Sequence, residues 1–172
     1  MKDSKTAVEI EKKYVIKYPD IDALRKMEGY YASNIVQIYL PSDDGSTHRV
    51  RRRVVGDRVT YTETKKVRID KMSSKETEGE ITEERFLELS ANPKSGTHAI
   101  HKVRHAFFYL GQQFEIDVYP EWQHTAIMET ELETRETNVI FPECIKILRD
   151  VTGDKRYSNA AMSREFPAEI SI

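Results

Sequence analysis

Hydrophobic and polar residues alternate along most of this chain with a period of two, which is typical of β-strands. In VEIEKKYVI, Val8 and Ile10 lie on one face of the expected strand, and Glu9, Glu11 and Lys13 lie on the other. Similar alternation recurs in the later segments. The expected strands are 7–18, 33–41, the two arms of a hairpin over 47–69 that turns at Gly56-Asp57, 71–82, 97–110, 112–120 and 125–134.

Three segments show helical spacing instead. Segments 21–28 and 83–90 each place apolar residues on one face of a short helix. Segment 142–151 has apolar residues at helical spacing and is followed by Gly153, so it predicts an amphipathic helix. Cys144 falls among these apolar positions, which predicts an inert thiol in the core.

Charged residues fall on one face of strand after strand, opposite an apolar face. The acidic set is Glu9, Glu11, Glu76, Glu78, Glu80, Glu115, Asp117, Glu129 and Glu131, and the basic set is Lys13, Arg49, Arg51, Arg53, Lys66, Lys102 and Arg104. Since apolar faces must be covered for the chain to fold, the charged faces would point at one another across the sheet. A solvated outer face is the alternative for any one segment alone, and mutual salt bridges can neutralise most of these groups.

These patterns predict a mainly β (α+β) fold. About eight strands joined by short connections favour antiparallel pairing. Eight antiparallel strands can close into a barrel with room for one ligand, although a sandwich has the same strand count. We therefore expect residues 1–172 to form a single domain, whose charged strand faces enclose a polar interior and whose few helices pack outside.

The composition narrows the choice of function. The 172 residues carry 27 basic and 29 acidic side chains, and this balance argues against a nucleic-acid-binding protein. The single cysteine excludes an intrachain disulfide. The sequence contains no signal-like apolar core and no apolar run near the ~20 residues that a membrane helix needs. We expect a cytoplasmic protein with neither nucleic acid nor membrane as partner.

The two charged sets suit phosphate chemistry. Arginine donates two parallel hydrogen bonds to phosphate oxygens, and lysine adds a point charge, so the basic set suits a polyanion. Surplus carboxylates suit a hard dication, Mg²⁺ or Mn²⁺, which prefers oxygen ligands. Phosphoryl transfer requires both kinds of group in one site.

The order of these motifs resembles that of the CYTH domain of the triphosphate tunnel metalloenzymes, over about residues 7–162. The family's ExExK signature is matched by Glu9-Ile10-Glu11-Lys12-Lys13. The later matches are Arg49 and Arg51 in RVR, Thr64 and Lys66 in TKK, Glu76 and Glu78, Lys102 and Arg104 in KVR, Glu115 and Asp117 in EIDVY, Glu129 and Glu131 in METEL, and DVTGDKRYSNAAM near the end. There are two departures: Ser74 and Lys75 stand where many members have Arg, and Asp150 stands where Glu often precedes the late VT.

The resemblance implies a fold and roles for the residues. The fold is an eight-stranded antiparallel β-barrel tunnel with a polar, charged interior, which binds a triphosphate along its axis. The metal ligands would be Glu9, Glu11, Glu129 and Glu131, with the closer of the last two unassigned. The groups that bind phosphate oxygens would be Lys13, Arg49, Arg51, Lys66, Lys102 and Arg104. Arg53 is added to them because it shares the charged face of its strand, and the alternative for Arg53 is a position at the tunnel mouth without a binding role. The catalytic residues would be Lys13 together with Glu76, Glu78 and Asp117, which would hold a second metal or orient the attacking water.

We therefore predict a Mg²⁺- or Mn²⁺-dependent triphosphatase that hydrolyses inorganic triphosphate to diphosphate and orthophosphate. The alternatives are an adenylate cyclase or a thiamine triphosphatase on the same fold, or a non-catalytic polyphosphate-binding module. The sequence leaves open the physiological substrate, the metal preference and the oligomeric state, a homodimer included. Surface or packing roles are expected for His98, His101 and His105, and a loop-covering role for Trp122.

Overall fold

The structure, a computed structural model, describes residues 2–171. Over this range the chain forms nine β-strands and a few short helices. The strands are β1 (Lys2–Lys17), β2 (Glu28–Leu40), β3 (Thr47–Val55), β4 (Arg58–Arg68), β5 (Ser73–Ile81), β6 (Ile100–Tyr109), β7 (Gln112–Val118), β8 (Thr125–Leu132) and β9 (Ile147–Asp150). The helices are α1 (Ile21–Leu24), α2 (Glu83–Ser90), the 3₁₀ turn η1 (Lys155–Tyr157) and α3 (Asn159–Met162).

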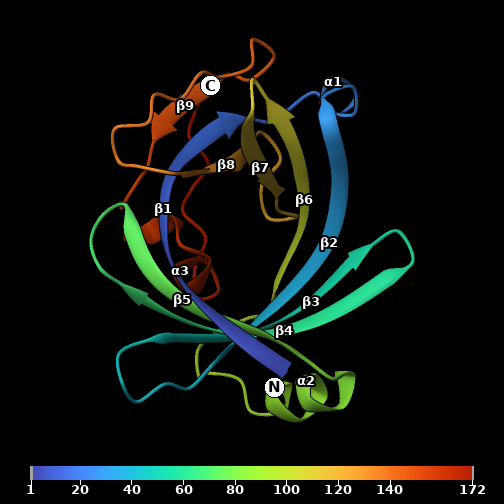
Figure 1. Ribbon diagram of the computed structural model, residues 1–172, viewed down its shortest axis with the longest axis vertical. Helices are drawn as coiled ribbons and strands as arrows, with labels where there is room; N and C mark the ends of the chain where they lie inside the picture. The colour runs from blue at the N-terminus through green and yellow to red at the C-terminus, as the bar shows by residue number, and fades with distance from the viewer. Residues whose placement is uncertain (1, 172) are drawn as a thin grey trace.

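The strands form one closed antiparallel barrel (Figure 1). Their order is β5-β4-β3-β2-β6-β7-β8-β1-β9, and pairing between β5 and β1 closes the ring. The 16-residue β1 pairs with β5 along its first part and with β8 along its second part. β9 is an extra strand that pairs with β1 beyond the end of β5. The predicted eight-stranded antiparallel barrel is therefore confirmed, with one additional strand.

The outer faces of β1, β6, β7 and β8 share an apolar core. Tyr14, Phe107, Phe114 and Met128 are buried in it, and α1 places Leu24 against them. The rings of Phe107 and Phe114 stack with their centroids 5.7 Å apart. Each such side chain contributes about 1.5–3 kcal/mol through burial, so this outer core accounts for much of the stability of that half of the barrel.

Helix α2 covers a smaller apolar area on the outside of β2 and β3. The side chain of Thr82 accepts a hydrogen bond from the backbone N–H of Arg85 and so caps the start of the helix. Phe86 is then buried beside Leu40 and Val50. Among residues 2–171, no helix combines the length and the apolar character that crossing a bilayer requires.

One end of the barrel interior is filled by the C-terminal segment. The inward-facing side chains of Val15, Tyr119 and Ile127 pack there against Tyr157 and Met162. Val15, Tyr119 and Ile127 each lie two residues from a charged inward position, namely Lys13, Asp117 and Glu129. The inner face of the barrel therefore changes from charged to apolar near this end. The charged part of the interior is therefore confined to the remaining length of the barrel.

The helix predicted over 142–151 is wrong. Ile147–Asp150 is instead the extended strand β9, and Ile145 reaches the outer core from a turn in which its N–H donates to the carbonyl of Pro142 at 3.0 Å. A turn followed by a strand satisfies the same apolar spacing, and pairing with β1 overrides the local helical preference. Cys144 lies in this turn and is exposed, so its predicted place in the core is also wrong.

Candidate functional site

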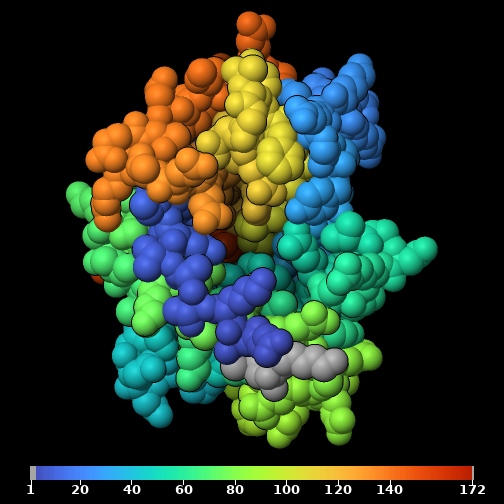
Figure 2. All heavy atoms as spheres, viewed as in Figure 1, coloured from blue at the N-terminus to red at the C-terminus, as the bar shows by residue number. Residues whose placement is uncertain are grey.

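The inward faces of the strands enclose a cavity of about 790 Å³. Figure 2 shows a hollow on this face of the molecule, bordered by β1 in blue and by β6 and β7 in yellow. Most of the predicted site residues line the cavity: Glu9, Glu11, Lys13, Arg49, Arg51, Arg53, Lys66, Glu76, Glu78, Arg104, Glu115, Glu129 and Glu131. Lys102 and Asp117 lie behind this lining, and each is almost fully buried.

Strand pairing brings these side chains together, because residues paired across neighbouring strands point to the same face. Lys13 on β1 pairs with Glu129 on β8, and Glu11 pairs with Glu131. Glu129 also pairs with Glu115 on β7. The first charged segment of the sequence is therefore placed directly against the last one inside the barrel.

Glu129 and Asp117 are the acidic members of a buried ion network. Glu129 contacts Lys13 Nζ at 2.9 Å and Arg104 Nη2 at 3.3 Å. Asp117 accepts hydrogen bonds from Lys102 Nζ at 2.6 Å and from Arg104 Nε and Nη2 at 2.7 and 2.8 Å. Burial opposes the ionisation of Asp117, but Arg104 and Lys102 outweigh it and lower its pKa to about 2. Both carboxylates are thus neutralised by cations within the protein, and Arg104 is held in one orientation.

The arginines of β3 have no carboxylate at ion-pair distance among the described residues. Burial opposes the charge of Arg49, but Tyr39, Glu76 and Glu78 outweigh it at longer range and raise the pKa of Arg49. Arg51 donates from Nε and Nη2 to the neutral Oε1 of Gln37 at 3.0 and 2.8 Å, and Arg53 donates from Nε to Ser33 Oγ at 3.1 Å. Arg49 Nε is buried without a hydrogen-bond partner. Over residues 2–171, the ion pairs of the cavity involve none of these three arginines.

The electrostatics of Arg51 reflect this imbalance. Burial, reinforced by the nearby charges of Arg49 and Arg104, lowers the pKa of Arg51 to about 9. The cationic form remains dominant at neutral pH, but it is held in surroundings that disfavour it. An anion in the cavity would remove this penalty.

The opposite imbalance occurs near the start of β1. Burial, followed by repulsion from Glu76 and Glu131, raises the pKa of Glu9 to about 7. Burial and the nearby Glu115 raise the pKa of Glu131 as well. Glu76 is partly neutralised by Lys66, whose Nζ lies 2.8 Å from its Oε1. In the order of the ring, β1 and β8 lie three and four strands away from β3, so the surplus carboxylates and the surplus arginines occupy opposite walls.

The carboxylate-rich wall has the donor chemistry of a site for a hard dication. Glu9, Glu11 and Glu131 offer carboxylate oxygens, the ligands that Mg²⁺ and Mn²⁺ prefer, and their mutual repulsion is relieved by a cation. Among the described residues, no three acidic, histidine or cysteine side chains already converge in a metal-coordinating arrangement. The donor set therefore fits a dication in chemistry, while its ligand geometry is not preformed.

Several lining residues escaped the sequence analysis. Tyr39 lines the cavity from the inner face of β2, where the period of two within segment 33–41 could have indicated it. Gln37 lies on the same face and accepts from Arg51, although it is not part of the lining. Lys155, Ser158 and Asn159 come from the C-terminal segment, in which no strand period places a side chain.

The side chains of uncertain role have packing or surface positions. His101 is exposed, and His105 is buried with its Nδ1 2.8 Å from the hydroxyl of Tyr30. Trp122 is buried in the apolar end of the barrel, and its indole N–H donates to the carbonyl of Pro167 at 3.0 Å. These residues lie outside the cavity lining.

Comparison with known proteins places the fold. No family model and no curated protein matches the sequence. By structure, the chain is similar to the inorganic triphosphatase NE1496, with 27% sequence identity and a TM-score of 0.56 over 93% of this chain and 97% of that chain. It is also similar to PH1819 from Pyrococcus horikoshii OT3, with 19% identity and a TM-score of 0.55 over 74% of this chain and 80% of that chain. A candidate adenylate cyclase from Bacillus halodurans has 18% identity and a TM-score of 0.50 over 76% of this chain and 83% of that chain. This chain therefore has a triphosphatase-like β-barrel fold, consistent with its resemblance to the CYTH domain.

Proposed function

We propose that this protein is an enzyme that hydrolyses a triphosphate inside the barrel, with inorganic triphosphate as the preferred substrate. The observation that carries the proposal is the separation of charge across the cavity. Arg49, Arg51 and Arg53 have no carboxylate partner among the described residues, while Glu9 and Glu131 repel their neighbours on the other wall. A polyanion bound together with a dication satisfies both walls at once.

The arrangement of the arginines favours an extended anion. Alternate residues of a strand repeat every ~6.8 Å, so the three guanidinium groups form a row along β3. A single orthophosphate is too small to contact the whole row, whereas a linear triphosphate offers oxygens along its length. The similarity to NE1496, described as an inorganic triphosphatase, supports the same substrate class.

The carboxylates would hold the metal ion. Glu9, Glu11 and Glu131 are the best placed of the predicted ligands, because Glu129 already contacts Lys13 and Arg104. A dication bound there would supply charge neutralisation for the phosphate oxygens on its side of the cavity.

The remaining groups act on the substrate and on water. The three arginines of β3 bind oxygens of the triphosphate and stabilise the charge that spreads over the transferring group. Lys13 stays cationic beside Glu129 and adds a point charge, since its pKa is raised: Glu129 and Glu11 outweigh the effect of burial. Glu76 and Glu78 orient the attacking water, and Glu78 is itself fixed by the hydroxyl of Thr64 at 2.6 Å.

Asp117 and Lys102 receive supporting roles in this proposal. Both carboxylate oxygens of Asp117 accept hydrogen bonds from Arg104 and Lys102. In this proposal Asp117 therefore orients Arg104 and does not bind the attacking water. Lys102 donates to Asp117 from behind the lining, where burial lowers the pKa of the lysine to about 7, so Arg104 supplies the steadier charge beside Asp117.

Product analysis tests the proposal. The purified protein is incubated with inorganic triphosphate, ATP or thiamine triphosphate, with Mg²⁺ or Mn²⁺ and with a chelator as the metal-free control. We expect metal-dependent release of orthophosphate, fastest from inorganic triphosphate. Cyclic AMP from ATP without orthophosphate would indicate a cyclase, and tight binding of triphosphate without turnover under either metal would indicate a non-catalytic binder.

A further inference from the structure

One edge of β1 changes partner within the ExExK segment. Along this edge residues 2–10 pair with β5 and residues 14–16 pair with β9, so the described structure has no paired strand beside residues 11–13. The backbone N–H of Glu11 donates there to the carbonyl of Met72 at 2.9 Å. The backbone N–H of Lys13 donates to the side-chain hydroxyl oxygen of Thr152 at 3.0 Å. A side chain thus takes the place of the carbonyl that a continuing strand would provide.

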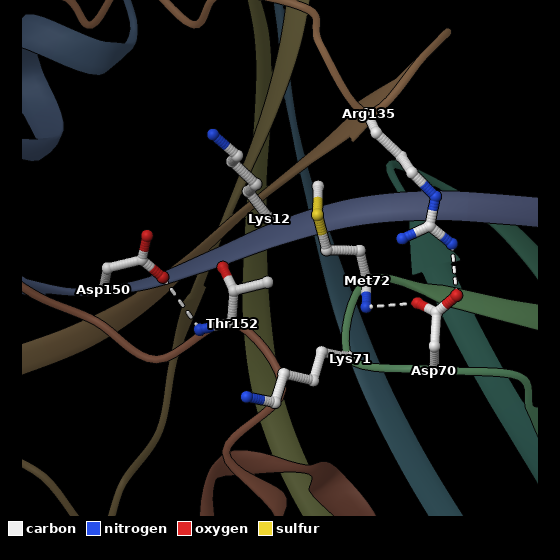
Figure 3. Close-up of a pocket in the computed structure, with 7 residues that line it drawn as sticks. All are labelled: Lys12, Asp70, Lys71, Met72, Arg135, Asp150 and Thr152. Carbon is white, nitrogen blue, oxygen red and sulfur yellow. Dashed lines mark hydrogen bonds and ion pairs between the residues drawn. The ribbon is translucent and has the colours of Figure 1, made fainter.

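The turn that carries Thr152 is held in place from three sides. The N–H of Val151 donates to the carbonyl of Lys13 at 2.9 Å, and the N–H of Thr152 donates to Asp150 Oδ1 at 2.9 Å (Figure 3). Gly153 has φ = +78°, and a Cβ at this position would lie 2.8 Å from the Cβ of Lys71. The turn is therefore wedged between β1 and the loop between β4 and β5, and the position of the Thr152 hydroxyl is fixed.

The same segment also contacts the end of the Lys13 side chain. Lys13 Nζ donates to the carbonyl of Tyr157 at 3.4 Å while it pairs with Glu129 at 2.9 Å. Residues 151–157 thus contact Lys13 at its backbone N–H, its backbone carbonyl and its ammonium group. Figure 3 shows Thr152 with Lys12 and Asp150 in a second pocket, and Thr152 is not among the residues that line the cavity inside the barrel.

We propose that Thr152 is a positioning residue for Lys13: its hydroxyl completes the hydrogen bonding of β1 at the break and so fixes the lysine that faces the substrate. The kinetic part of this inference rests on the proposed triphosphatase function, but the structural link can be measured without any activity. Thr152 does not touch substrate, so it acts only through Lys13.

Amide hydrogen exchange tests the structural link directly. In Thr152→Val the shape is kept and the hydroxyl is lost, so the Lys13 amide should exchange about tenfold faster than in the wild type, as expected for one lost hydrogen bond. Thr152→Ser should restore slow exchange. The matched control is Thr6→Val, on the same strand as Lys13. It removes an exposed hydroxyl that contacts the hydroxyl of Thr77 on β5 at 3.0 Å, and it should leave the exchange rate of the Lys13 amide unchanged. Unchanged exchange at Lys13 in Thr152→Val would overturn the proposal.

A double-mutant cycle tests the kinetic consequence. Thr152→Val should lower kcat about tenfold with a smaller change in KM, equivalent to about 1.4 kcal/mol of transition-state stabilisation, and Thr152→Ser should recover most of it. In a Lys13→Met background, Thr152→Val should have no further effect. The same tenfold loss in both backgrounds would mean that Thr152 acts on the fold in general, which contradicts a positioning role.

Two outcomes separate this inference from the proposed function. If the wild type releases no orthophosphate from triphosphate, the proposed function fails, while the exchange measurement still decides the link between Thr152 and Lys13. If Thr152→Val does not fold, Thr152→Ala removes the same hydroxyl with less bulk and carries the same predictions for the Lys13 amide.

Discussion

Replacement of Arg51 by alanine is the most direct test of the arginine row. Arg51 uses two of its five N–H donors on Gln37, so three remain for an anion in the cavity. One charge-assisted contact is worth about 1.5–3 kcal/mol. Arg51→Ala should therefore weaken the binding of triphosphate by roughly 10- to 150-fold.

The assay is calorimetric titration of triphosphate into the metal-free protein, with Arg52→Ala as the matched control. Arg52 is the next residue on β3 and alternates onto the outer face, so its removal changes the net charge equally without reaching the cavity. Equal losses for the two variants would mean that only the overall charge matters, and no loss for Arg51→Ala would place Arg51 outside the site. The variant should stay folded and within about 1 kcal/mol of the wild-type stability, because a disfavoured buried cation is lost along with its neutral contacts.

Three further predictions address the rest of the cavity. First, the folded protein holds a proton on Glu9 between the ordinary pKa of 4.5 and the raised pKa of about 7, whereas the unfolded chain has released it. The free energy of unfolding of the metal-free protein should therefore fall by roughly 1–3 kcal/mol as the pH rises through that range. Thermal unfolding of Glu9→Gln should lose this pH dependence, and a slope equal to that of the wild type would contradict the assignment. Second, Asp117→Asn removes the carboxylate that pairs with buried Lys102 and leaves Arg104 with Glu115 and Glu129 alone, so it should cost about 3–5 kcal/mol in chemical denaturation. Asp154→Asn, which breaks the exposed pair with Arg156, should cost far less, and similar losses would argue against the buried network. Third, Thr62→Glu puts a carboxylate across from Arg51, so it should stabilise the free protein and weaken the binding of triphosphate. Thr62→Gln is the neutral control. Stronger binding of triphosphate by Thr62→Glu than by Thr62→Gln would contradict this reasoning.

The period of two in the sequence was enough to predict the strands and the direction of their charged side chains, whereas closure into a barrel followed from the resemblance to the CYTH domain. Each inward residue of β1, from Glu9 to Lys13, could be assigned to its face without knowing its partner. The pairing of Lys13 with Glu129 could not be derived in this way, because it depends on which strands become neighbours and in which register. Strand order is set by the whole sheet and not by any one segment.

Depth along the barrel was a second quantity that the period could not provide. Lys102 and Arg104 share a face of β6, yet Arg104 lines the cavity and Lys102 lies behind it. The difference arises because Asn159, from the C-terminal segment, comes within 3.5 Å of Lys102 Nζ. The sequence analysis assigned no element to residues 155–162, so their role in filling the end of the barrel was missed.

The absence of ion pairs at the arginine row within the described chain follows from the neighbours of β3. Across β4 the three inward arginines face Thr64, Thr62 and Thr60, and across β2 they face Tyr39, Gln37 and Ile35. All six partners are uncharged, so no adjacent side chain can neutralise a guanidinium group at cross-strand distance. The acidic residues of the cavity are concentrated on β1, β5, β7 and β8 instead. Strand pairing alone therefore does not bring the arginines into contact with these carboxylates. Over residues 2–171, the ion pairs of the cavity and of the groups behind it form around Arg104, Lys102, Lys13 and Lys66, while Glu76 and Glu78 act on Arg49 at longer range. The absence of ion pairs at the arginine row over this range is what supports the proposed binding of a polyanion there.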